Sequence, residues 1–90
     1  MIVPDDLRNG IIVHARKPKG NMHREFSLWK VNDKWQRIRS SDHSRIGIPL
    51  HIDVILNYLN KYDFEIVGEW EVRYHQKSIL RDKFNLNGAL

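Results

Sequence analysis

Ninety residues, 41% of them apolar and none of them cysteine, are enough for one domain with a small hydrophobic core. The lack of cysteine excludes a disulfide framework and a thiolate zinc site, and it suits a reducing compartment. No run approaches the roughly 18 apolar residues of a membrane span, and residues 1–9 do not resemble a signal peptide. We therefore expect a single cytoplasmic domain over residues 1–90, with no membrane partner.

The net charge of +4 is distributed unevenly along the chain. Residues 8–45 contain ten Lys/Arg and three acids, a net charge of +7. Residues 46–90 contain five Lys/Arg and six acids, a net charge of −1. A basic region of this kind can meet phosphates or an acidic protein, or it can be a solvated surface with no partner.

The first segments read as a lead-in, a strand and a loop. Residues 1–9 contain Pro4 and are expected to be an irregular lead-in. Residues 11–16 are short and rich in β-branched side chains, which favours a strand. Residues 17–21, Lys-Pro-Lys-Gly-Asn, combine turn formers with two cations and predict an exposed loop.

Two further strands are predicted around an Asn-Asp pair. Residues 24–31 and 34–39 are strand-like, and Asn32-Asp33 between them tolerates the left-handed backbone of a tight turn. The pattern indicates a hairpin. Residues 40–47 are expected to form a polar loop.

One amphipathic helix is predicted from Pro49 to Lys61 or Tyr62. Proline suits the first helical turn, where its missing N–H is not needed. Four apolar residues then follow the i, i+3, i+4, i+7 rule and form one stripe. They are Ile52, Ile55, Leu56 and Leu59.

The region after the helix alternates with period two over residues 64–75, which predicts a strand with one apolar and one charged face. Gly68 should interrupt it with a bulge or bend. Residues 78–84 are expected to return as a last strand, and residues 85–90 to form a tail. The expected core side chains of the long strand are Ile66, Trp70 and Val72, and the expected outward carboxylates are Glu65, Glu69 and Glu71.

The predicted element order is β-β-β-α-β-β. A single amphipathic helix must bury its stripe, and the sheet offers the one apolar surface large enough to receive it. The fold class is therefore α+β: a two-layer sandwich of one helix on one face of a mostly antiparallel sheet.

The segment from the helix onward resembles a family of small bacterial α+β domains of unknown function. That family reads Leu-Asn, then Gly-Trp-Glu-Leu-Val, then Ile-Leu-Lys-Arg. Here the matching stretches, within residues 50–84, are 55–57 with 59–60, 64–68 and 79–81. The chain departs from the pattern at Asp63-Phe64, where the family has Gly-Trp. The resemblance implies the α+β fold and no activity.

No residue pattern predicts catalysis, a metal or a cofactor. The five histidines lack the three- or four-residue spacing of a helical or hairpin metal site. Residues 41–44, Ser-Asp-His-Ser, contain the residue types of nucleophilic catalysis, but triads are assembled from separated segments. The composition is also that of a turn. We expect a protein that is not an enzyme.

The candidate binding residues are cations of the basic half of the chain. Two of them, Arg37 and Arg39, share one strand face and could grip an acidic group, or could instead pair with the glutamates of the long strand. The latter, a structural lattice, is the interpretation that the pattern favours. The whole set is Arg16, Lys17, Lys19, Arg24, Arg37 and Arg39.

Two functions follow from this pattern. The first is a small non-catalytic binding module or inhibitor that docks through its basic surface onto an acidic protein partner. The alternative is a nucleic-acid-binding domain in which cations contact phosphates and Phe26, Trp29 and Trp35 stack on bases, unless these aromatics all belong to the core. Because a small sheet leaves two edges, we also predict a homodimer.

Overall fold

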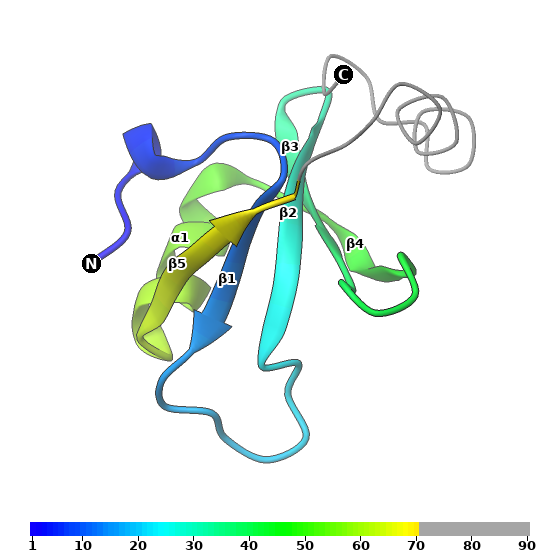
Figure 1. Ribbon diagram of the computed structural model, residues 1–90. Coiled ribbons are helices and arrows are strands. Elements are labelled where there is room, and N and C mark those ends of the chain that lie inside the picture. The colour runs from blue at the N-terminus through cyan, green and yellow to red at the C-terminus, as the bar shows by residue number, and fades with distance from the viewer. Residues whose placement is uncertain (71–90) are drawn as a thin grey trace.

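The computed structural model describes residues 1–70 of the chain (Figure 1). Five strands, one α-helix and one short 3-10 turn make up this part. Their bounds are η1 Pro4–Asp6, β1 Ile11–Ala15, β2 Glu25–Val31, β3 Lys34–Ile38, β4 Arg45–Leu50, α1 Ile52–Lys61 and β5 Phe64–Glu69.

The strands form one sheet in the order β4-β3-β2-β1-β5, and every neighbouring pair is antiparallel. The helix α1 links the two outer strands, β4 and β5, and therefore has to cross the width of the sheet. Figure 1 shows it lying against one face. The predicted α+β class, an antiparallel sheet with one helix packed against it, is confirmed.

The main core lies between α1 and the sheet. Ile55 and Leu59 of the predicted stripe are fully buried, and Ile52 and Leu56 pack against the core while remaining partly exposed. The stripe was thus predicted correctly, because its spacing sets one helix face whatever the helix packs on. The sheet side chains that meet it include Ile11, Val13, Phe26, Leu28 and Phe64.

The β2–β3 hairpin is confirmed in detail. Asn32 and Asp33 are the two loop residues, Val31 pairs with Lys34, and Asn32 has a φ of 58°. Asparagine tolerates this left-handed backbone better than most residues do, because its short polar side chain can hydrogen-bond locally.

The predicted loop over 40–47 is confirmed for residues 40–44 and wrong for residues 45–47, and the predicted helix start at Pro49 is wrong. Residues Arg45–Leu50 form β4 beside β3, and the helix begins at Ile52. Gly47 and Pro49 obscure this strand in the sequence, since both are rare in central strands. An edge strand tolerates them: Gly47 adopts a φ of 65° where the pairing register shifts, and proline needs no ladder partner at an open edge.

The strand after the helix differs from its predicted pattern. The side chain of Ile66 is 37% exposed and therefore is not the core residue that we predicted. β5 lies at the edge of the sheet, so its side chains have a neighbouring strand on one side alone and stay more exposed than those of a central strand. The register of β1 and β5 shifts opposite Ile12 and Val13, so the irregularity predicted near Gly68 is present. Val72, Glu71, the return strand over 78–84 and the tail over 85–90 lie outside the described residues.

The sheet face opposite α1 is also buried at its centre. Ser27, Trp29, Gln36 and Ile38 are almost fully inaccessible there. The ring of Trp70 packs edge-on against Trp29, with 5.3 Å between ring centroids. The strands β2 and β3 are therefore covered on both faces.

The N-terminal segment contributes to the core, although residues 1–9 were expected to be a lead-in. Ile2 is buried, and its backbone is held by the side chain of Asn60 in α1. Ile2 N–H donates to Asn60 Oδ1 at 2.8 Å, and Asn60 Nδ2 donates to the Ile2 carbonyl at 2.9 Å. This two-way amide clamp fixes the segment beside β5.

Candidate binding surface

The candidate surface is the loop of residues 16–24 between β1 and β2, hereafter the basic loop. It contains no Asp or Glu and joins the two strands at one end of the sheet (Figure 1). Met22 packs against the core from within this polar stretch. Lys19 N–H lies 3.1 Å from Met22 Sδ, which closes a short turn over Gly20. The loop is thus exposed but anchored at one point.

Three of the predicted binding residues project from this loop and have no anionic partner among residues 1–70. Lys17, Lys19 and Arg24 are exposed. Within residues 1–70, no carboxylate forms an ion pair with any of the three. Their charges are therefore available to a partner from outside.

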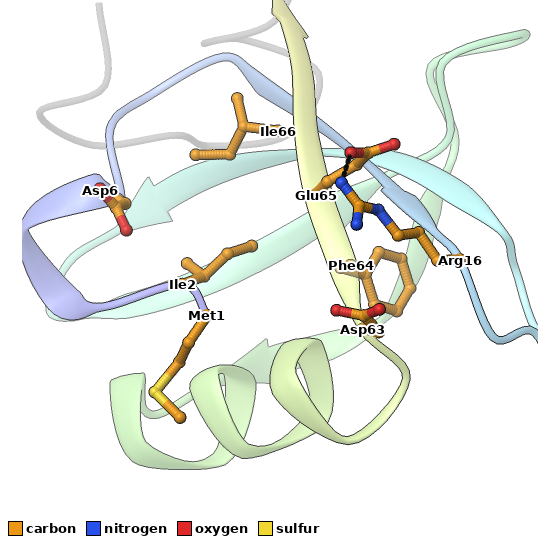
Figure 2. A pocket seen from close by; sticks show the side chains of 8 residues that line it. All are labelled: Met1, Ile2, Asp6, Arg16, Asp63, Phe64, Glu65 and Ile66. Carbon is orange, nitrogen blue, oxygen red and sulfur yellow. Dashed lines mark hydrogen bonds and ion pairs between the residues drawn. The ribbon is translucent and has the colours of Figure 1, made fainter.

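Arg16 begins the basic loop but is already engaged. Its guanidinium Nη2 donates to Glu65 Oε2 of β5, and the dashed line in Figure 2 marks this pair. The hydrogen bond from Arg16 holds the pKa of the Glu65 carboxyl below its usual range. Arg16 therefore joins the loop to the edge strand, and its charge already has a partner within the molecule.

Arg37 and Arg39 do not join the basic loop. Arg37 lies on the helix face of β3, with its guanidinium carbon 5.5 Å from the centroid of the Tyr58 ring, a cation–π contact. Arg39 Nη1 lies 3.5 Å from Asp42 Oδ2 in the following loop. The structure thus separates the six predicted residues into a loop cluster and two cations with local partners.

The predicted lattice between Arg37, Arg39 and the glutamates of the long strand is wrong. Strands β3 and β5 are separated by β2 and β1 in the sheet. Glu65 pairs instead with Arg16, and Glu69 Oε2 lies 3.3 Å from Arg8 Nε. The outward exposure predicted for Glu65 and Glu69 is confirmed, with side chains 42% and 51% exposed.

The aromatic residues proposed for base stacking are all core residues. Phe26 and Trp35 lie in the core beneath α1, and Trp29 is covered on the opposite face. A base can stack on a ring only where the ring face is exposed. These three side chains therefore offer no stacking platform.

Within the Ser-Asp-His-Ser stretch at 41–44, Asp42 and Ser44 form hydrogen bonds with each other. Asp42 Oδ1 accepts hydrogen bonds from Ser44 N–H at 3.0 Å and from Ser44 Oγ at 2.7 Å. These bonds lower the pKa of the Asp42 carboxyl. His43 adopts a φ of 61° and places its ring 4.3 Å from that of Trp70. The residue types thus serve a side-chain-closed turn.

Two residues that hold exposed segments in place were not predicted. Met22 anchors the basic loop, and the signal for it was a single apolar side chain within a polar run. Asn60 clamps the N-terminal segment, and no sequence signal marks it among the other polar residues of the helix.

Among residues 1–70, no group of three or more His, Asp or Glu side chains is placed to hold a metal ion. Within the same range, no helix is long and apolar enough to cross a membrane. Comparisons with protein-family models, curated proteins and solved structures gave no match to this chain. The assignment of function therefore rests on the surface itself.

Proposed function

We propose that this chain is a non-catalytic binding module that contacts an acidic surface of a partner protein through its basic loop. The observation that carries the proposal is the position of Lys17, Lys19 and Arg24. All three are exposed on a loop that contains no acid, whereas Arg16, Arg37 and Arg39 each have a partner inside the molecule. Exposed loops on a rigid sheet are common sites of binding residues.

A protein partner is favoured over a nucleic acid because the aromatic residues of β2 and β3 are buried. Single-stranded nucleic acids are held by stacking together with phosphate contacts, and here the loop supplies phosphate contacts alone. Binding of nucleic acid by phosphate contacts remains the alternative function. The cysteine-free composition supports a cytoplasmic setting for either partner.

The test compares two double charge reversals in the full chain. The first is Lys17→Glu with Lys19→Glu, on the basic loop. The matched control is Lys30→Glu with Lys34→Glu, which makes the same charge change beside the β2–β3 turn, at the other end of β2. The probes are a labelled peptide of alternating glutamate and serine and a labelled single-stranded thymidine oligonucleotide, followed by fluorescence anisotropy.

The loop reversal should weaken binding of the acidic peptide by about tenfold or more, since each exposed charge pair contributes on the order of 1 kcal/mol. The control reversal should change it much less. Equal losses in both variants would show that net charge alone drives the binding. Tighter binding of the oligonucleotide, with an affinity that falls steeply with salt, would favour the nucleic-acid alternative.

A further inference from the structure

On its outer edge, the side away from β1, β5 presents backbone N–H and C=O groups that no strand of residues 1–70 pairs with. Arg16 N–H donates to the Asp63 carbonyl at 3.1 Å, and His14 of β1 stands opposite Glu65. The backbone N–H and C=O groups of residues 63 and 65 therefore point toward β1. Because facing alternates along an antiparallel strand, Phe64 and Ile66 direct their N–H and C=O groups outward. Within residues 1–70 no strand pairs with this edge.

The two edges of the sheet differ in how well they could accept another strand. β4 is blunted by Pro49, which has no N–H, and by the left-handed Gly47 at a register shift. β5 has neither feature at Phe64–Ile66. It also exposes two consecutive apolar side chains, Ile66 at 37% and Val67 at 51%. An edge that no strand of residues 1–70 covers and that exposes apolar residues is a template for strand addition.

A groove of about 260 Å³ lies along this edge. Figure 2 shows β5 on one side of it and the N-terminal segment, with η1, on the other. The apolar side chains that line it are Ile2, Phe64 and Ile66, with Met1. The amide clamp between Asn60 and Ile2 holds the second wall in place.

The lining of the groove is acidic, in contrast to the basic loop. Three carboxylates line it, from Asp6, Asp63 and Glu65, and the one cationic side chain there is Arg16. Arg16 pairs with Glu65, which leaves the carboxylates of Asp6 and Asp63, and Asp6 Oδ2 accepts a hydrogen bond from Val3 N–H at 2.8 Å. Figure 2 shows Asp6 on the η1 side and Asp63 at the start of β5.

We propose that this groove accepts an extended basic segment of a partner protein, which pairs with β5 as an additional strand. An apolar side chain of the segment packs on Ile66, and Lys or Arg side chains near it meet Asp6 and Asp63. Main-chain hydrogen bonds to Phe64 and Ile66 provide affinity, and the carboxylates select for positive charge. The groove shares Arg16 with the basic loop but contains none of Lys17, Lys19 and Arg24, so the proposal stands independently of the proposed function.

A second copy of the chain fits this edge less well than a basic segment does. Antiparallel pairing of β5 with itself about Val67 sets Glu65 opposite Glu69, and pairing about Ile66 sets Asp63 opposite Glu69. Like charges directly opposite each other destabilise a strand pair.

The test uses the full chain and a labelled peptide of alternating valine and threonine flanked by lysines. Two control peptides carry glutamate in place of lysine or N-methyl groups on alternate backbone amides. The variants are Ile66→Lys, Asp63→Asn and, as the matched control on the other edge, Ile48→Lys, whose native side chain is 73% exposed. Asparagine tolerates the φ of 52° at position 63.

Ile66→Lys should weaken binding of the lysine peptide by about tenfold or more, and Asp63→Asn by about twofold to fivefold. Ile48→Lys should leave it unchanged, and both control peptides should bind poorly. Equal binding of the N-methylated peptide, equal losses in Ile48→Lys, or no binding of the lysine peptide would overturn the proposal. So would self-association of the chain that Ile66→Lys abolishes, because a second copy would then occupy the edge.

Discussion

The loops that follow β1 and β3 are both polar and both contain arginine, but they differ in whether their cations have an anionic partner in the same loop. In the β3–β4 loop, Arg39 pairs with Asp42, and Asp42 also accepts two hydrogen bonds from Ser44. The basic loop contains no acid, and it packs a methionine against the core. One loop pairs its arginine with its own aspartate, and the other leaves three cations exposed.

The difference shows that the number of cations in a segment is a poor guide to its binding capacity. Arg37 and Arg39 look equivalent to Lys17 and Lys19 in sequence, but each is committed to a neighbour in the folded chain. An exposed charge contributes to binding when no internal partner neutralises it. The predictions below test this contrast, beginning with the scaffold that both loops share.

The largest expected effect is on the shared core. Leu59 is fully buried, so Leu59→Ala should lower the free energy of unfolding by about 2–5 kcal/mol and loosen both loops together. Leu56 is partly exposed on the same stripe, and Leu56→Ala should cost clearly less. Urea denaturation of both variants checks this. Equal losses would mean that the helix packs in a different rotation.

A smaller effect should separate the two loops. Met22→Ser removes the apolar anchor of the basic loop and should lower the free energy of unfolding by about 1 kcal/mol, because the contacts of a partly buried side chain are lost. Met22→Leu keeps the volume and should cost less. Amide exchange should accelerate in residues 17–24 and stay unchanged in residues 39–44. Faster exchange in both loops would contradict an independent anchor.

The smallest expected effect is a loss of stability at acidic pH that arises from the β3–β4 loop. The Ser44 hydrogen bonds lower the pKa of Asp42 in the folded chain below its ordinary value of about 3.9, and Arg39 acts in the same direction. The folded state then binds fewer protons near that pH than the unfolded state. The stabilisation is therefore present above the unfolded pKa and is lost as the pH falls through the folded pKa.

The comparison of wild type with Asp42→Asn isolates this effect. Thermal unfolding between about pH 5 and pH 2 should show a steeper loss of stability in the wild type than in the variant. The basic loop contains no carboxylate, so amide exchange in residues 17–24 should not depend on Asp42. Identical pH profiles would show that the Asp42–Ser44 turn does not stabilise the fold.

The sequence predicted those features that depend on local pattern. The spacing of Ile55 and Leu59 defines a helix face, and Asn32-Asp33 defines a tight turn, without reference to the rest of the chain. β4 was not predicted because Gly47 and Pro49 are tolerated in an edge strand but are rare in a central one. A sequence does not show which strand lies at an edge until the strand order is known.

The placement of the candidate binding residues was predicted correctly only where it depends on the local sequence and not on the order of the strands. Lys17 and Lys19 were predicted on one exposed loop, because the turn-forming residues lie beside them in the sequence. Arg24 was assigned to the following strand, and it lies one residue before β2 begins. The pairing of Arg16 with Glu65 depends on β5 lying beside β1, across a helix that links opposite edges. No local pattern reports this order, so Arg37 and Arg39 were grouped with residues that they do not approach.

The most direct test of the contrast between the loops is an NMR titration of the ¹⁵N-labelled chain with the peptide of alternating glutamate and serine. Amide shifts report which residues meet the peptide, whatever its affinity. The account predicts that the largest shifts fall within residues 17–24 and that residues 39–44 stay in place. Shifts centred on residues 39–44, or spread evenly over every exposed cation, would contradict it.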